Sequence, residues 1–381
     1  MNKPSQQQKT IRKRLISNFK LVLLPLLIGI TCISCTKNDV LPSMLGSDIS
    51  NKKYVEILEN NLSTLPNNAQ VAIALVHNGN TDYLGVTNQN NELIKTDNAD
   101  KIFEIGSITK VFTSICLAEM VTSNEVSLTE TLQSQFDFPL RTGGDITFKQ
   151  LANHTSGLPV IPTNSNEIQN LNLEDPYAVY SYDNLKSYLQ NHIILNATSG
   201  TKYEYSNLGA GILGYSLAKK RNSTFEELLQ STIFQPLRME NTTTLIEQVD
   251  ATKLVEPRDI NGQVVSHWNF AETLSGGGSI KSSVIDMAKF IQKNFENDVV
   301  YNLPQVKTFK TEDNFHIGLG WYIYQDDEFT IYTHDGGTGG FSSMLMLDKN
   351  KKIGVIVLSN VEDFQNSISP LCNDFILEIN N

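Results

Sequence analysis

The feature that most constrains the fold is the run 107–121 (SITKVFTSICLAEMV), which is apolar on nearly every face. A helix of this kind lies inside a domain rather than on its surface, so the rest of the chain must cover it on all sides. The chain can do so, because it has 381 residues, of which 40% are hydrophobic and only 19% charged. This length and composition predict a globular chain that buries one large core or two coupled ones.

Strand patterns occur towards both ends of the chain and helical patterns occupy its middle. Near the N-terminus a helix is predicted at 53–62, followed by strands at 69–76 and 81–86 around the turn Asn78-Gly79-Asn80. Helices are predicted at 147–153, 183–191, 209–220, 224–233 and 282–294, strands at 320–324, 330–334, 342–348 and 353–359, and a closing helix at 367–379. We therefore predict an α+β fold, in which one antiparallel sheet from the N- and C-terminal thirds is flanked by helices, with a mostly helical insertion at roughly 122–300.

The first 34 residues are typical of an export signal. They hold six basic residues and no acidic ones, and the basic start is followed by an apolar run at 21–30. This run is too short for a spanning helix, which needs about 20 apolar residues. Ile33-Ser34-Cys35 resembles a relaxed bacterial lipoprotein box, which makes Cys35 a candidate for lipidation. Ordinary cleavage and secretion stays an alternative, since Cys32 stands where Leu is usual. A polar tether at 35–50 and a folded domain at 51–380 complete the predicted organisation of an exported, membrane-anchored protein facing the periplasm or cell surface.

The net charge and the spacing of the histidines argue against nucleic-acid and metal partners, and the cysteines indicate buried thiols. The net charge is -11, and the basic first segment leaves the body more acidic still, so nucleic acid is not an expected partner. The histidines show no short metal-ligand spacing, and we predict no metal and no cofactor. Cys116 and Cys372 lie in apolar helical patterns, which favours buried free thiols, although a disulfide between them stays open.

Ser107-Ile108-Thr109-Lys110 has the form S-x-x-K, which places a hydroxyl and an amine on one face of a helix. A serine becomes a good nucleophile when a neighbour takes its proton, and a buried lysine can lose enough proton affinity to do so. Taken alone, the tetrapeptide more often marks an ordinary helix start.

Two further motifs follow along the chain. Tyr205-Ser206-Asn207 offers a phenol that can exchange a proton and an amide that can orient a substrate. His334-Asp335-Gly336-Gly337 ends a predicted strand, where glycine lets a substrate approach the backbone and an amide can help to stabilise an oxyanion. Each motif alone also fits an ordinary loop or turn.

In this order, the three motifs resemble those of the serine β-lactamase and D-alanyl-D-alanine peptidase family, over about residues 55–378. The segments FEIGSITKVFT, ITFKQLANHTSGLP and the glycine stretch 275–279 support the resemblance. It implies that Ser107 is the acylated nucleophile, that Lys110 activates it and that Tyr205 shuttles protons. It further implies that Asn207, His334, Gly336 and Gly337 bind substrate, and that the amides of Ser107 and Gly337 form the oxyanion hole. Which of Lys110 and Tyr205 is the working base stays open.

The third motif departs from the family pattern, in which Lys and Thr help to bind a substrate carboxylate. Here His334 and Asp335 occupy those places, and a carboxylate at Asp335 would repel such a substrate if it faced the cleft. The candidate substrates are therefore a cell-wall peptide of D-amino acids, a β-lactam, and an ester or other amide, as for an esterase, D-aminopeptidase or amidase. A non-catalytic relative that binds wall fragments is a further alternative. The G-x-G-x-x-G match at 209–214 follows no buried strand and indicates helix packing instead.

Overall fold

The computed structural model describes residues 45–168 and 170–380. Its strands are β1 (Gln70–His77), β2 (Asn80–Gln89), β3 (Glu92–Lys95), β4 (Phe103–Glu104), β5 (Lys281–Ser282), β6 (Phe309–Glu312), β7 (Phe315–Ile317), β8 (Tyr322–Gln325), β9 (Thr330–Gly337), β10 (Ser342–Asp348) and β11 (Ile353–Ser359). Its helices are α2 (Leu45–Asp48), α3 (Lys52–Leu62), α4 (Thr109–Thr122), α5 (Phe148–Ala152), α6 (Tyr182–Ser187), α7 (Asn207–Lys220), α8 (Phe225–Leu229), α9 (Val284–Asn294), α10 (Val299–Asn302) and α11 (Ser369–Glu378).

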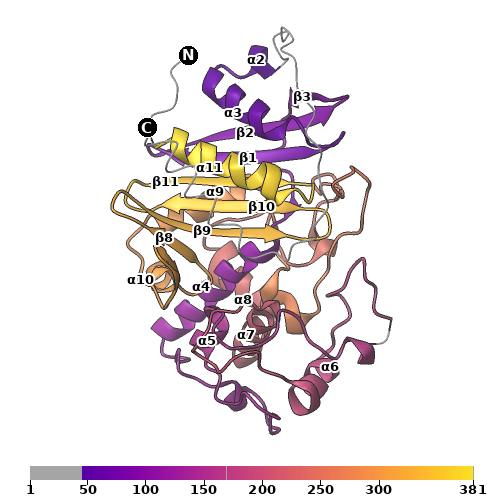
Figure 1. The fold of residues 1–381 in the computed structure, drawn as a ribbon, viewed down its shortest axis with the longest axis vertical. Coiled ribbons are helices and arrows are strands. Elements are labelled where there is room, and N and C mark those ends of the chain that lie inside the picture. The colour runs from indigo at the N-terminus through magenta and orange to yellow at the C-terminus, as the bar shows by residue number, and fades with distance from the viewer. Residues whose placement is uncertain (1–44, 169, 381) are drawn as a thin grey trace.

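The central sheet joins the two ends of the chain. In the part of the chain that the structure describes, it has nine antiparallel strands in the order β3-β2-β1-β11-β10-β9-β8-β7-β6. Strand β1, with indigo colour in Figure 1, pairs with the yellow β11, and Val71 lies opposite Ser359. The hairpin of β1 and β2 turns at Asn78 and Gly79, which both have positive φ as a tight two-residue hairpin turn requires. The predicted α+β fold and its antiparallel sheet are confirmed.

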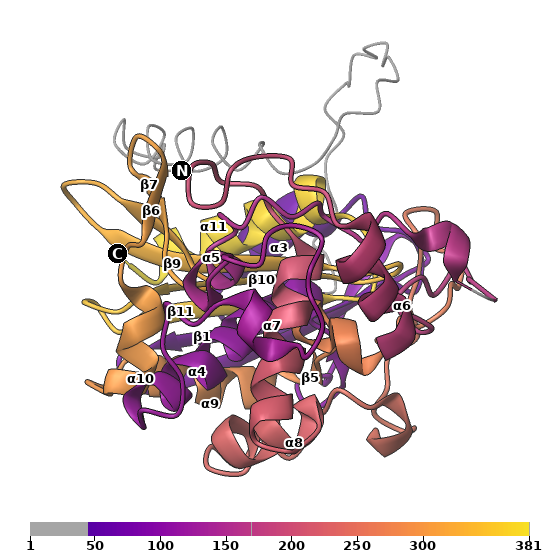
Figure 2. The same ribbon diagram turned by 90° about the horizontal axis from the view of Figure 1, so that it is seen from below.

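Alternation along the strands gives the sheet two buried faces. In β1, Val71, Ile73 and Leu75 face an outer core that α3 and α11 cover with residues such as Leu58 and Phe375. The intervening residues of β1 face an inner core, which also contains residues of α4, α7 and α9. Figure 2 views the molecule from this side, with α4, α5, α7 and α8 in front of the sheet. Helix α4 is buried along its length except at Glu119 and its last two residues, as its apolar sequence predicts.

Several boundaries differ from the sequence-based expectation. Leu45 and Ile49 are buried in the outer core, so the folded body begins no later than Leu45 rather than at residue 51, and part of the predicted tether belongs to it. Strands β3, β4, β5, β6 and β7 were not predicted, because each has only two to four residues and shows no clear alternation. In the insertion, α5, α6, α8 and α9 are shorter than expected, whereas α7 begins two residues earlier than predicted, at Asn207.

Other expectations concern the termini and the thiols. The predicted signal at 1–34 and the candidate lipidation site Cys35 lie outside the described residues. Within 45–168 and 170–380, no helix is long and apolar enough to cross a membrane. Cys116 and Cys372 are buried free thiols, one in the inner core and one in the outer core. The sheet separates them, which excludes the disulfide that the sequence left open.

The glycines of α7 bring its backbone unusually close to the 3₁₀ turn Glu272–Gly277. A Cβ at Gly211 would lie 2.7 Å from the Cα of Leu274, and one at Gly214 would lie 2.8 Å from the Cα of Gly276. The G-x-G-x-x-G match therefore serves helix packing, as the sequence indicated. This close approach positions the turn that carries Gly277.

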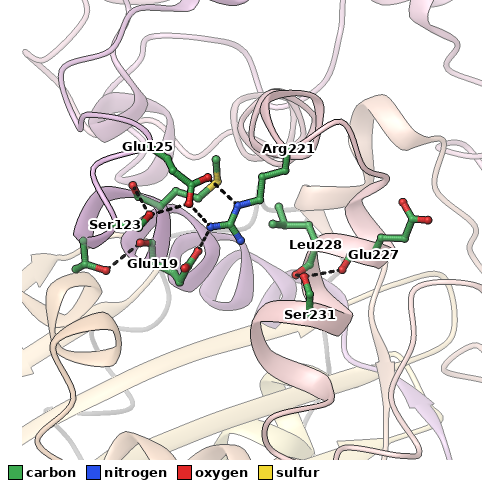
Figure 3. Close-up of polar contacts among 9 residues, drawn as sticks. Glu119, Ser123, Glu125, Arg221, Glu227, Leu228 and Ser231 are labelled. Carbon is green, nitrogen blue, oxygen red and sulfur yellow. Dashed lines mark hydrogen bonds and ion pairs between the residues drawn. The ribbon is translucent and has the colours of Figure 1, made fainter.

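An ion cluster joins the C-terminal ends of α4 and α7. Arg221, which follows α7, donates to both carboxylate oxygens of Glu125 at 2.7 and 3.0 Å and also pairs with Glu119 (Figure 3). These side chains are partly exposed to solvent, so the cluster contributes little more than an ordinary surface ion pair. It nevertheless fixes the two helices at the end remote from Ser107.

We expect Gly211→Ala to lower the free energy of unfolding by about 1–2 kcal/mol, because overpacking outweighs the helix propensity that Ala normally adds. Chemical denaturation measures the change. The control is Gly46→Ala in α2, where a new Cβ would meet nothing within 4 Å. Equal stability of the two variants would contradict tight packing between α7 and the turn.

Candidate active site

Ser107 lies in a 3₁₀ turn, Gly106–Ile108, that leads directly into α4. Its side chain is half-buried, whereas the flanking residues from Ile102 to Lys110 are otherwise buried. Two threonines of α4 bind the chain opposite: the Thr109 hydroxyl accepts from the Ile280 amide at 3.1 Å, and Thr113 donates to the Gly276 carbonyl at 2.9 Å. The start of the buried helix is thus fixed while Ser107 stays accessible.

Lys110 lies one helical turn beyond Ser107 and is only 2% exposed. Its Nζ is 2.8 Å from Ser107 Oγ, 2.7 Å from Asn207 Oδ1 and 2.6 Å from the Gly277 carbonyl oxygen. The predicted contact between hydroxyl and amine is therefore present. The two carbonyl oxygens each take an N–H, which directs the third position of the amine towards Ser107.

Tyr205-Ser206-Asn207 is a helix start. Ser206 is the N-cap of α7, and its hydroxyl accepts from the Gly209 amide at 2.8 Å and donates to the Pro159 carbonyl. A serine is a favoured N-cap, and here it fixes the residues on either side. Tyr205 consequently donates to Ser107 Oγ at 2.7 Å, and its ring lies 4.7 Å from Lys110 Nζ.

Two side chains that the sequence did not single out for chemistry support this motif. Tyr177 accepts a hydrogen bond from Asn207 Nδ2 at 3.1 Å, and its ring stacks on Phe270 at 4.8 Å. His154 accepts from the Ser206 amide, and its ring lies 4.5 Å from that of Tyr205. His154 therefore helps to hold Tyr205 and Ser206 in place.

The end of β9 faces the nucleophile along an open edge. Strand β8 pairs with Thr330 to Thr333, whereas the segment from His334 to Gly337 pairs with β10 alone among the described strands. A Cβ at Gly336 would lie 2.1 Å from the Ile105 carbonyl oxygen, and one at Gly106 would lie 2.7 Å from the Gly337 nitrogen. Glycine is therefore required where β9 contacts the turn that carries Ser107.

His334 and Asp335 lie at the same open edge. His334 is 1% exposed, and its Nδ1 donates to the Asp335 carbonyl at 2.6 Å. Burial, with the charge of Lys110, lowers the pKa of His334 to about 3, so the ring is neutral. Asp335 is half-buried, and burial raises the pKa of its carboxyl to about 6.

Burial shifts the pKa values of the two candidate bases in opposite directions. It lowers the pKa of Lys110 to about 7, although the charge of Asp335 acts in the opposite direction. It raises the pKa of Tyr205 well above its ordinary value, and the hydrogen bond to Ser107 offsets this only in part. Near neutral pH the phenol is protonated, while a large fraction of Lys110 is neutral and can take the serine proton.

The structure thus brings Ser107, Lys110, Tyr205 and Asn207 together, with His334, Gly336 and Gly337 beside them. Sequence reasoning missed two groups, the Gly277 carbonyl and Tyr177. The stretch 275–279 drew attention to Gly277, but a backbone oxygen has no signature of its own. Tyr177 lies in an irregular loop, and no local pattern relates it to Asn207.

Comparisons with known proteins found several that are similar to this chain. The Beta-lactamase family model matches residues 58–369. The chain is 23% identical to a beta-lactamase of Escherichia coli strain K12 over 309 residues, 68% of this chain and 75% of that protein. It is 25% identical to the D-alanyl-D-alanine-carboxypeptidase/endopeptidase AmpH of the same strain over 306 residues, 74% of this chain and 77% of AmpH.

A solved structure is similar in fold. The β-lactamase/D-alanine carboxypeptidase from Pseudomonas syringae superposes with a TM-score of 0.70 at 19% sequence identity. The match covers 86% of this chain and 96% of that chain.

We expect the rate at which a fluorophosphonate labels Ser107 to rise with pH and to reach half its maximum near pH 7, the pKa of Lys110. Below that pH the amine is protonated and cannot accept the serine proton. Lys110→Met keeps the length of the side chain but should lower the rate by about 10²–10⁴-fold and remove the step. A labelling rate in the wild type that stays constant between about pH 5 and pH 9 would contradict this assignment.

Proposed function

The chain belongs to the Beta-lactamase family of serine hydrolases, and we propose that Ser107 forms a covalent ester with the acyl part of a cell-wall peptide of D-amino acids, which water then releases. The observation that carries this proposal is the convergence of Lys110 Nζ and Tyr205 OH on Ser107 Oγ, at 2.8 and 2.7 Å. A hydroxyl held between an amine of pKa about 7 and a protonated phenol is prepared for acyl transfer.

In the proposed acylation, the neutral amine of Lys110 takes the proton of Ser107 as Oγ attacks the carbonyl carbon. Asn207 Oδ1 and the Gly277 carbonyl hold the two N–H bonds of the amine, so its lone pair points at the hydroxyl. The bond from Oγ to carbon forms and the bond to the leaving nitrogen breaks. Tyr205 donates its proton to that nitrogen and recovers one from Lys110, so that the amine leaves neutral.

The amides of Ser107 and Gly337 are the proposed donors to the oxyanion. The close approach of the Gly106 and Gly337 backbones supports this assignment, because it brings the two amide-bearing segments into contact. Ser107 also lies at the N-terminal end of α4, whose dipole favours negative charge there. Loss of one such donor typically costs about 10²-fold or more in rate. Asn207 Nδ2 retains one N–H besides that given to Tyr177, which can bind the substrate amide.

The choice of substrate class rests on similarity. One relative is described as a D-alanyl-D-alanine-carboxypeptidase/endopeptidase, and others are described as beta-lactamases. A β-lactam is the second candidate, since it would acylate the same serine and differ in how fast the ester is hydrolysed.

The test is intact mass spectrometry of the folded protein after exposure to a penicillin, a D-Ala-D-Ala peptide and a p-nitrophenyl ester. We expect an adduct on Ser107 or turnover with at least one of them, and a loss of about 10³-fold or more in Ser107→Ala. Tyr205→Phe should retain the acylation site but slow turnover of the peptide, whose amine needs a proton to leave, more than turnover of the ester. A folded wild-type protein that gives neither adduct nor turnover would favour a module that only binds wall fragments.

Export and lipid anchoring at Cys35 are part of the proposal. Residues 1–34 support export by their basic start and apolar run, and Ser34 before Cys35 supports the lipoprotein box. A cell-wall substrate would be met outside the cytoplasmic membrane, where such a signal delivers the chain.

We expect Cys35→Ser to shift the protein from the membrane fraction to the soluble exported fraction, because a thioether-linked lipid requires the cysteine. Cell fractionation with immunoblotting measures the distribution. Ser43→Ala, in the predicted tether and outside the lipoprotein box, is the control and should stay with the membrane. Unchanged membrane association of the Cys35 variant would exclude lipidation there.

A further inference from the structure

We propose that the side of this site formed by the third motif, His334 to Gly337, accepts a leaving group with a hydrogen-bond donor or a positive charge. It rejects a leaving group with a free carboxylate. This inference rests on the proposed function and narrows its substrate class. Three observations carry it: the two faces of β9 at its open edge, a nitrogen of His334 that is unpaired among the described residues, and the carboxylate of Asp335, whose charge acts on Lys110 and Tyr205.

The register of β9 places its two polar side chains on opposite faces of one open edge. His334 lies opposite Leu345, which faces the inner core, and Asp335 lies opposite Met344, which faces the outer core. The backbone from His334 to Gly337 has no described strand on its other side. A substrate chain lying along this edge therefore meets His334 on one side and Asp335 on the other.

His334 offers an acceptor and no charge. Its Nδ1 holds the ring proton, because it donates to a carbonyl, so the other nitrogen is an acceptor. That Nε2 is buried and has no hydrogen-bond partner within residues 45–168 and 170–380. A buried polar atom without a partner is costly, and a donor on the substrate would satisfy it, whereas a carboxylate oxygen would repel it.

Asp335 adds a negative charge to the same region. No described side chain donates a hydrogen bond to its carboxylate, and its charge raises the pKa values of Lys110, Tyr205, Tyr203 and Tyr322. Lys110 is the cation that acts on Asp335, but it must be neutral to serve as the base and is charged only between taking the proton of Ser107 and passing it on. The described residues at this edge thus provide no lasting positive charge for a substrate carboxylate.

The consequence concerns which bond in a peptide is cleaved. Removal of a C-terminal residue requires the site to accept the free carboxylate of that residue. Cleavage of an internal bond releases an amine whose chain continues as an amide, with an N–H that can donate to His334. The third motif therefore favours internal or carboxyl-blocked peptides over free C-termini.

The experiment compares matched leaving groups. The first pair is N-acyl-D-Ala-D-Ala with a free carboxylate and the same peptide as its C-terminal amide. The second set is phenyl acetates whose ring carries a carboxylate, a carboxamide or an aminomethyl group, which acylate an active serine even if the peptides turn over slowly. We expect kcat/KM in the wild type to be at least about tenfold lower for each carboxylate than for its neutral partner.

Three variants test whether Asp335 and His334 cause the discrimination between charged and neutral leaving groups. Asp335→Asn keeps the shape of the side chain and should reduce the discrimination at least about fivefold. His334→Lys should reduce it further by adding a cation, with a thermal melt to establish folding. Asp327→Asn, which removes an exposed carboxylate from the turn between β8 and β9, should leave the ratio unchanged.

The outcomes separate the inference from the proposed function. If no ester and no fluorophosphonate acylates Ser107 in folded protein, the proposed function fails and the inference with it. If Ser107 is acylated but the wild type shows no preference between charged and neutral leaving groups, or Asp335→Asn leaves the preference intact, the inference alone is overturned.

Discussion

The interaction on which the site depends is the burial of Lys110 among three oxygen atoms, two of which come from distant parts of the chain. Ser107 comes from the turn that leads into the same helix, Asn207 from the start of α7 and the Gly277 carbonyl from the turn packed on α7. An amine removed from water favours its neutral form, which lowers its pKa to about 7 and makes it a usable base. The apolar surface of α4, which keeps Lys110 away from water, thus also sets the pKa that lets Lys110 act as a base.

Much of the fold could be predicted because its signals are local. The buried helix, the hairpin at Asn78 and Gly79 and the strands β9 to β11 each follow from periodicity or turn residues. The S-x-x-K contact also follows, since helical geometry alone places the two side chains together. The short strands β3 and β6 carry too few residues to alternate clearly, and Leu45 is a single apolar residue in a polar segment, so neither could be recognised.

The parts of the site that escaped prediction are those fixed by tertiary packing. The Gly277 carbonyl reaches Lys110 because glycines in α7 admit the turn 272–277, and Tyr177 reaches Asn207 from a loop held by ring stacking on Phe270. The orientation of Asp335 likewise depended on the register between β9 and β10. The residue types of the three motifs indicated the chemistry of the site. Partners that come from the backbone or from irregular loops could be identified only in the folded structure.

Strand β1, the first of the sheet along the chain, pairs on one side with β11, the last. This pairing can form only after β11 has been synthesised. Contacts between such distant segments form slowly, because a long loop must close before they become favourable. During synthesis, Ser107 leaves the ribosome well before β9, against which its turn packs. Ser107 of a nascent chain therefore stays unreactive until nearly the whole chain has left the ribosome.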